Sequence, residues 1–311
     1  MRIALTHNLR LSESEDEAEF DTKETVDALA HALERIGHRV ERIEVSGPAS
    51  RTVARLEAYS PDLIFNAAEG RRGRFREAFF PALFEELGIP YTGSDSYALT
   101  VTQDKQLAKM IVAQQGLVTP RWLFVDRLER LDLRALTFPV IVKPNFEGSS
   151  KGISQASVIE EPARLPSYVA EMLRRFPAGL LIEQYIDGKD VSVGFLEALA
   201  EGPSQGILAP TEVIHPAGGR FPILDYERKS RQERGVELRT PARLDRGVEE
   251  VLRLTARKAF ESIDCRDLGR ADFRVTPSGA VYLIEINALP SLDPASSIFA
   301  SAALEGLHYD G

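Results

Sequence analysis

Two carboxylates and one amide in the segment "RADFRVTPSGAVYLIEIN" (residues 270–287) have the types and the spacing of a metal site. We expect two strands joined by a Pro-Ser-Gly turn, with Asp272 on the first strand and Glu285 and Asn287 on the second. Glu285 and Asn287 share one face, and Leu283 is expected to face the other way. Such oxygen donors suit Mg²⁺, which also takes oxygens from phosphates and water. The alternative is that the carboxylates have protein partners, because unpaired buried charge is costly.

A lysine at the end of an apolar run is the second candidate. In "FPVIVKPNFEGSSKGIS" the run ends at Lys143 and is followed by a small, hydroxyl-rich loop at 145–152, which contains Ser149 and Ser150. Glycine and serine allow close backbone approach and supply N–H and O–H donors to phosphate oxygens. No GxxxxGK[ST] motif is present. We therefore weigh a polyphosphate held between lysine and loop against a lysine that reaches solvent beside a solvated hairpin.

The segment "IEQYIDGKD" (182–190) combines a strand end with charged residues. In one interpretation it is a hinge whose backbone and Glu183 read an adenine edge, while Asp190 accepts hydrogen bonds from ribose hydroxyls. In the other it is an exposed turn whose charges are only solvated.

Strands and helices alternate in the first third of the chain. Apolar periodicity predicts strands at 2–6, 38–45 and 62–67 and helices at 22–37 and 77–88. This alternation indicates a doubly wound parallel sheet with helices on both faces. We expect this α/β domain to cover residues 1–97.

The remainder of the chain has an α+β pattern. We expect helices at 98–115, 166–175 and 245–262, strands at 122–125, 139–143 and 153–159, and a strand, bend and strand over 179–196. The charged stretch 225–238 and the acidic run 12–19 are expected to be solvated loops. The division predicted here is a central domain at 98–179 and a C-terminal, metal-binding domain at 180–311.

Bulk properties narrow the function classes. A chain of 311 residues is long enough for two or three domains. Its net charge of −9 argues against nucleic-acid binding. The single cysteine, Cys265, excludes an internal disulfide and a cysteine-rich metal site. No apolar run is long enough for a bilayer, and the N-terminus is too soon polar for a signal peptide. We expect a cytoplasmic protein that binds neither membrane nor nucleic acid.

Taken in order, these segments resemble the ATP-grasp superfamily and, within it, the D-alanine–D-alanine ligases, over nearly the whole chain. "GIPYTGSDSYALTVTQDK", which ends at Lys105, is similar to the passage into the central domain, and "LDYERKS" is similar to a mobile loop with a lysine, Lys229. The resemblance implies an ATP-grasp fold. It implies that the nucleotide is bound by Lys105, Lys143, Ser149, Ser150, Glu183, Gln184, Tyr185, Ile186, Asp190 and Lys229.

The reaction implied is ADP-forming ligation of a carboxylate to an amine through an acylphosphate. The resemblance gives catalytic roles to Arg270, which stabilises the oxyanion, and to Ser149 and Lys229. It implies two Mg²⁺ ions, with Mn²⁺ as an alternative, at Asp272, Glu285 and Asn287. It also suggests a homodimer.

The substrate half departs from the family pattern. Where the family usually has a His-Gly pair, this chain has Glu69-Gly70. A serine, Ser230, replaces the tyrosine that usually follows the loop lysine, and Ser291 replaces a usual glycine. The nearby arginines are either a solvated helix start or a site for a substrate carboxylate: Arg71, Arg72, Arg74 and Arg76. These departures lead us to expect a substrate other than D-alanine. An authentic D-alanine–D-alanine ligase and a non-catalytic ATP-binding regulator are the alternatives.

Overall fold

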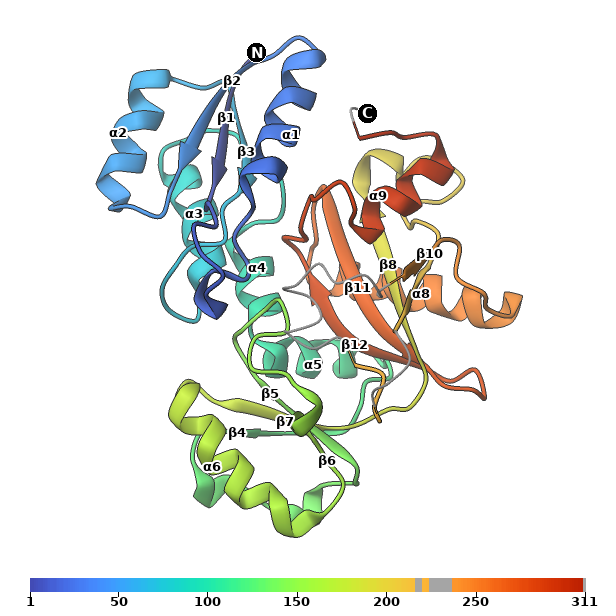
Figure 1. Cartoon of the computed structure of the whole chain (residues 1–311). Coiled ribbons are helices and arrows are strands. Elements are labelled where there is room, and N and C mark those ends of the chain that lie inside the picture. Colours follow the sequence, from blue (N-terminus) through green and yellow to red (C-terminus); the bar gives the residue numbers. More distant parts are fainter. Residues whose placement is uncertain (216–219, 224–236, 310–311) are drawn as a thin grey trace.

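The computed structural model describes residues 1–215, 220–223 and 237–309, and within these ranges the chain forms three β-sheets (Figure 1). The N-terminal sheet is parallel, in the order β2-β1-β3. Its strands are β1 (Arg2–His7), β2 (Arg39–Glu44) and β3 (Leu63–Ala67). They lie where the sequence predicts them.

Helices cover both faces of this sheet (Figure 1). Alternate residues of β1 and β3 face α1 (Lys23–Arg35) on one side and α2 (Ala49–Tyr59) and α3 (Arg76–Glu86) on the other. The sequence did not predict α2, because it begins without a side-chain cap and buries only Thr52 and Leu56. Its apolar stripe is therefore short.

The single helix expected at 98–115 is two helices, α4 (Ser96–Gln103) and α5 (Lys105–Gln114). Asp104 between them has an extended backbone, and its Oδ1 caps α5 by accepting from the Leu107 N–H at 3.1 Å. The same Oδ1 accepts from Asn145 Nδ2 at 2.7 Å. Asp104 therefore connects the start of α5 to Asn145, the residue that follows strand β5 (Val140–Pro144).

The second sheet is antiparallel, in the order β4-β7-β5-β6, and α6 packs against it. Its elements are β4 (Trp122–Val125), β5 (Val140–Pro144), β6 (Val158–Ile159), β7 (Leu180–Gln184) and α6 (Leu165–Arg175). The strand expected at 153–159 shrinks to β6 because Gln155–Ser157 form a 3-10 turn with a Ser154–Ser157 capping box.

The third sheet is also antiparallel, in the order β10-β9-β8-β11-β12. Its strands are β8 (Lys189–Leu196), β9 (Thr211–Ile214), β10 (Glu237–Arg239), β11 (Leu268–Val275) and β12 (Val281–Asn287). Strands β9 and β10 were not predicted. Of the loop expected at 225–238, residues 225–236 lie outside the described ranges and the rest begins β10.

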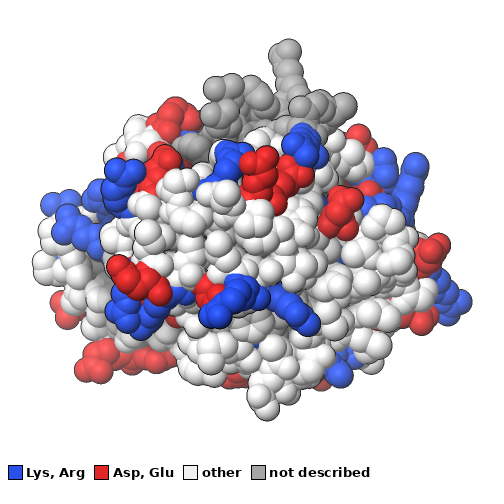
Figure 2. Space-filling view, turned by 90° about the horizontal axis from the view of Figure 1, so that it is seen from below, with Lys and Arg blue, Asp and Glu red and all other residues white. Residues whose placement is uncertain are grey.

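Helices pack on the third sheet from the neighbouring parts of the chain. One apolar core joins β11 and β12 to α4, α5 and α8 (Arg246–Ser262), and Ile298 of α9 (Ser297–Ala302) packs on Leu208. Within the described ranges, no helix is long and apolar enough to cross a membrane. On the face shown in Figure 2, basic and acidic side chains are interspersed.

The three-domain division stays a prediction, but sheet membership favours different boundaries. Strand β7, at Leu180–Gln184, pairs with β4 and β5 and so belongs to the second sheet. Helices α4 and α5 share their core with the third sheet. We would therefore place the second boundary after Gln184 and assign 96–114 to the C-terminal core.

Candidate active site

The hairpin β11–β12 brings the expected metal ligands together. Its register sets Asp272 opposite Glu285 and Arg270 opposite Asn287. Directly opposed side chains of an antiparallel pair lie on the same face of the sheet. The two carboxylates and the amide therefore share one face with the arginine.

A β-bulge explains why Leu283 faces away from Glu285 although the two are an even number of residues apart. Phe273 pairs with Leu283, so Ile284 is an extra residue in β12. Leu283 is 2% exposed and belongs to the core, whereas the Glu285 side chain is 32% exposed. The bulge thus turns Glu285 out of the core, as expected.

Arg270 forms a bidentate ion pair with Asp272. Its Nε lies 2.9 Å from Oδ1, its Nη2 lies 2.9 Å from Oδ2, and Ser192 Oγ donates to Oδ1 at 2.7 Å. Asp272 therefore has protein partners, as the alternative interpretation of the sequence required. The catalytic role of Arg270 stays a prediction.

Lys105, the first residue of α5, connects the hairpin to the glycine- and serine-containing loop. Its Nζ donates to the Glu147 carbonyl at 2.5 Å and lies 3.8 Å from Glu285 Oε2. One positive charge therefore stands between the expected metal site and the expected phosphate loop.

The donor set of the hairpin fits Mg²⁺. Asp272, Glu285 and Asn287 offer oxygen donors, which this ion prefers, and leave coordination positions for phosphate and water. No group of three or more histidine, cysteine or acidic residues suited to a metal occurs in the part of the chain that the structure describes. The expected site therefore depends on the Asn287 oxygen and on a bound polyphosphate to complete it.

Lys143 does not reach solvent. Its Nζ lies 2.5 Å from Glu183 Oε1, and Lys109 Nζ of α5 lies 2.8 Å from Glu183 Oε2, with all three side chains at most 5% exposed. Burial lowers the pKa of Lys109 to about 8, although the negative charge of Glu183 acts to raise it. Burial opposes ionisation of Glu183, but the two lysines hold its pKa below the usual value. The sequence did not single out Lys109, although it lies four residues after Lys105 on the same helix.

The loop after β5 has a specialised backbone. Ser149 and Ser150 have φ angles of +48° and +59°, a region that residues with a Cβ rarely adopt. At Gly148 an added Cβ would lie 2.6 Å from Glu19 Oε1. The loop is therefore shaped by a contact with the N-terminal domain.

That contact is a buried ion-pair network centred on Glu19. Arg76 Nη2 lies 2.7 Å from Glu19 Oε1 and Lys151 Nζ lies 2.8 Å from Oε2, and all three side chains are at most 8% exposed. The Gly148 N–H donates to Oε1 at 2.6 Å. Although burial opposes ionisation, Arg76 and Lys151 lower the pKa of Glu19 to about 2.

The acidic run 12–19 is therefore a solvated loop only in part, since Ser12, Glu13, Ser14 and Asp16 are exposed whereas Glu15 and Glu19 are ion-paired. Besides Glu19, Glu15 accepts from the Gly152 N–H at 2.6 Å and pairs with Arg175 at 2.9 Å. For these two acids the expectation was wrong because their partners lie far away in sequence, 57 residues for Arg76 and 132 for Lys151. For the arginine cluster the outcome is mixed, since Arg76 is buried and ion-paired whereas the other three are exposed.

In the expected hinge, Asp190 at the start of β8 is already bound by two groups. Its carboxylate lies 2.6 Å from Arg274 Nε and 2.5 Å from His215 Nε2. The Arg274 guanidinium also stacks 5.4 Å from the centre of the Tyr185 ring. A role of Asp190 toward ribose stays a prediction.

The backbone of the hinge begins where β7 ends. Gln184 pairs with Val140 of β5, and the Tyr185 N–H donates to the Pro139 carbonyl at 2.9 Å. Tyr185 and Ile186 are 8% and 7% exposed. Their assignment to the nucleotide stays a prediction, as does that of Lys229, which, like Ser230, lies outside the described residues.

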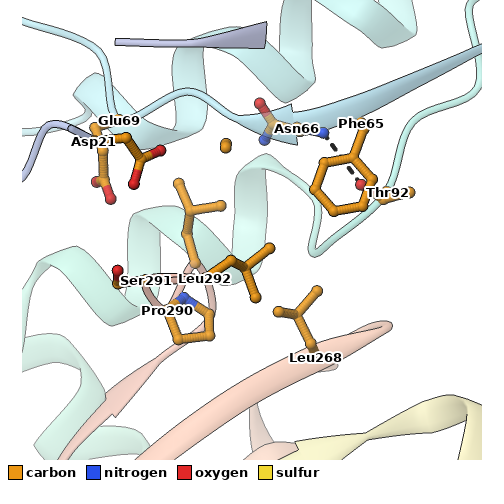
Figure 3. A pocket seen from close by; sticks show the side chains of 11 residues that line it. Asp21, Phe65, Asn66, Glu69, Thr92, Leu268, Pro290, Ser291 and Leu292 are labelled. Carbon is orange, nitrogen blue, oxygen red and sulfur yellow. Dashed lines mark hydrogen bonds between the residues drawn. The ribbon is translucent and has the colours of Figure 1, made fainter. Parts of the chain in front are cut away.

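A small pocket opens where the N-terminal domain meets the loop after β12. Figure 3 shows Asp21 and Glu69 side by side in it, with Ser291 and Leu292 across from them. The departures at Glu69 and Ser291 thus meet in one place. Asp21 was not identified from the sequence.

Comparisons with known proteins place these features in context. The family model described as "D-ala D-ala ligase C-terminus" matches residues 111–311. A D-alanine–D-alanine ligase from Aquifex aeolicus is 30% identical and covers 99% of this chain and 97% of its own. Another from Citrifermentans bemidjiense is 34% identical, over 91% of this chain and 85% of its own. The crystal structure of D-alanine–D-alanine ligase from Bacillus anthracis complexed with ATP superposes with a TM-score of 0.78 at 23% identity, over 100% of this chain and 94% of that one.

These similarities confirm the ATP-grasp fold and the resemblance expected from the sequence. They also favour an enzyme over a non-catalytic regulator.

Proposed function

Because the chain belongs to the D-alanine–D-alanine ligase family of the ATP-grasp superfamily, we propose that it joins a small carboxylate substrate to an amine substrate, and that this pair is not two molecules of D-alanine. It is an ATP-dependent ligase that forms an amide or peptide bond. The proposal concerns the substrates, the metal and the residues that act.

The observation that carries the proposed site is the position of Lys105. Its amino group lies 2.5 Å from the Glu147 carbonyl and 3.8 Å from Glu285, so it joins the loop to the hairpin. A triphosphate in this position would be neutralised by Lys105 on one side and by Lys143 at the end of β5 on the other. Mg²⁺ held by Asp272, Glu285 and Asn287 would supply further charge neutralisation when bound.

The proposed reaction has two steps. The substrate carboxylate attacks the γ-phosphorus, which releases ADP and forms an acylphosphate. The amine then attacks the acyl carbon, phosphate leaves, and the amine loses a proton. Arg270, held in place by Asp272, would stabilise the oxyanion formed in the second step.

A substrate other than D-alanine is supported by the electrostatics of the N-terminal side. Glu69 and Asp21 place two carboxyl groups in the pocket, whereas the carboxylate of Glu19 is ion-paired with Arg76 and Lys151. A ligand must match this charge pattern. Authentic D-alanine–D-alanine synthesis is the second candidate, because relatives at 30% and 34% identity carry that name.

The test is a coupled ADP-release screen over pairs of amino acids and small carboxylic acids, with mass detection of products. We expect ADP and a condensed product in equal amounts for at least one pair. ATP hydrolysis that no added amine or carboxylate increases would contradict the proposal. We also propose a homodimer in the cytoplasm, where ATP is available. Its size can be measured by light scattering.

A further inference from the structure

The acid that the sequence assigns to the ribose is held on both carboxylate oxygens by neighbouring strands. Arg274 Nε lies 2.6 Å from Asp190 Oδ1, and His215 Nε2 lies 2.5 Å from Oδ2. Asp190 pairs with Arg274 of β11 on one side, and β8 and β11 run side by side in Figure 1. On the other side it pairs with Val213 of β9, and His215 follows Val213 by two residues. Because opposed side chains of antiparallel strands lie on one face, the strand register itself brings these three polar groups together.

Arg274 is also fixed by groups other than Asp190. Its Nη1 donates to the Gly188 carbonyl at 3.0 Å, and its Nη2 donates to the Pro222 carbonyl. The guanidinium lies 5.4 Å from the centre of the Tyr185 ring, and the residue is 7% exposed. All three guanidinium nitrogens thus have a protein partner, and this rigid, planar group cannot turn away without losing several of them. Asp190 therefore has a fixed counter-charge.

The neighbouring acid on β9 does not replace Asp190. Glu212 pairs with Val191, the residue after Asp190, so its side chain lies on the opposite face of the sheet. Lys189 and Arg239 lie 3.4 and 3.5 Å from its carboxylate. The charges of both acids are therefore already compensated by basic side chains.

This pairing limits what Asp190 can contribute to nucleotide binding. A hydrogen bond to a charged acceptor is stronger than one to a neutral acceptor. The charge of Asp190 is balanced by Arg274, and each of its carboxylate oxygens already has a close partner. A sugar hydroxyl would have to compete with these partners, so we expect it to gain little from the carboxylate.

We propose that Arg274 determines the sugar specificity of this ligase: by holding Asp190, it leaves the 2′- and 3′-hydroxyls of the nucleotide without a charged acceptor, so that ATP and its deoxy analogues bind almost equally. Arg274 is thus a positioning residue that acts through Asp190. The inference rests on the proposed binding of the nucleotide at the hinge, and it replaces the sequence-based expectation for Asp190. Without Arg274 the carboxylate would keep its charge and be available to the sugar.

The test is calorimetric titration of the full chain with ATP, 2′-deoxy-ATP and 3′-deoxy-ATP in the presence of Mg²⁺. For the wild type we expect the Kd of each deoxy nucleotide to exceed that of ATP by less than about threefold, the effect of a weak hydrogen bond at most. Arg274→Met keeps the apolar stem and should raise at least one ratio to about tenfold or more, as a hydrogen bond to a charged acceptor would. The added substitution Asp190→Asn should reverse this rise. Arg274→Gln takes the place of Arg274→Met if the latter does not fold.

Two control variants separate this role from a general effect on folding. Arg274→Lys retains a positive charge beside Asp190 and should keep the wild-type ratios. Arg253→Met on α8 also removes an arginine that donates to two backbone carbonyls, those of Ile207 and Leu208, and should leave the ratios unchanged. A merely structural role of Arg274 would weaken all three nucleotides alike and would not change their ratios.

Nucleotide binding and turnover separate this inference from the proposed function. A wild-type ratio above about tenfold would overturn the inference, and so would unchanged ratios in Arg274→Met. Failure of all three nucleotides to bind would overturn it together with the proposed nucleotide site. Ratios that behave as predicted, without ADP release for any pair in the screen, would instead overturn the proposed ligation and leave the role of Arg274 intact.

Discussion

The ion-pair network at Glu19 permits a quantitative prediction for Glu19→Gln. This change keeps the shape of the side chain but removes the charge that Arg76 and Lys151 share at 2.7 and 2.8 Å. A pKa lowered from 4.5 to about 2 corresponds to about 3 kcal/mol in favour of the ionised form. Loss of one partner from a buried ion pair costs about 3–5 kcal/mol. Glu147, 3.4 Å from both cations, remains and offsets part of this, so we expect a loss of about 2–4 kcal/mol at pH 7.

The pH dependence gives the prediction a sign. Because the pKa of Glu19 is lower in the folded state, its contribution is fully present above about pH 4.5 and is lost as the pH falls toward 2. The difference between wild type and Glu19→Gln should therefore be largest at neutral pH and should shrink in acid.

Urea denaturation at several pH values measures this difference. The control is Glu160→Gln, which breaks a surface pair with Arg220 whose side chains are 39% and 74% exposed, and should change stability by less than about 0.5 kcal/mol. ATP affinity should fall in Glu19→Gln but not in the control, because Glu19 also holds the Gly148 N–H of the loop. Unaltered stability and ATP affinity in Glu19→Gln would refute this reasoning.

Three further predictions concern the nucleotide, the metal and the pocket. Lys143→Met keeps the apolar stem and should weaken ATP binding by about one to two orders of magnitude in calorimetry; full affinity would reject its phosphate role. Glu285→Gln and Asn287→Ala should abolish ADP release at ordinary Mg²⁺ while ATP still binds weakly, and full activity in either variant would reject the metal site. The pKa of Asp21 is raised to about 7 in the folded state, so its burial costs stability that grows as the pH rises from about 4 to about 7. Asp21→Asn should therefore stabilise the ligand-free protein by about 1–2 kcal/mol at pH 8 but not at pH 4 in thermal unfolding, and equal effects at both pH values would contradict this.

Local patterns made the strands and the hairpin predictable. Alternation and turn chemistry located β1, β3, β11 and β12, and the segment 270–287 gave the residues that now face each other across the sheet. Even the outward turn of Glu285 was expected, although its cause, the extra residue Ile284, is a feature of the pairing and not of the sequence pattern.

Contacts between distant segments could not be predicted from periodicity. Glu19 and Lys151 are 132 residues apart, and Lys109 meets Glu183 from another element, so nothing in the neighbouring residues indicates either pair. Asp21 was overlooked for the same reason, since its importance depends on Glu69 and on the loop after β12. Runs of charged residues were predicted to be solvent-exposed because most such runs are. Only the tertiary structure identifies the charged residues in them that form buried ion pairs.

The central claim, that this family member joins substrates other than two D-alanines, can be tested by one measurement. Steady-state ADP release is followed with D-alanine as the only substrate, and the dipeptide is detected by mass. We predict slow release and little dipeptide compared with the best pair from the screen, because Glu69 and Ser291, which replace the histidine and the glycine of the family pattern, both line the pocket. Efficient formation of D-alanyl-D-alanine at millimolar substrate would contradict the claim and establish the authentic ligase instead.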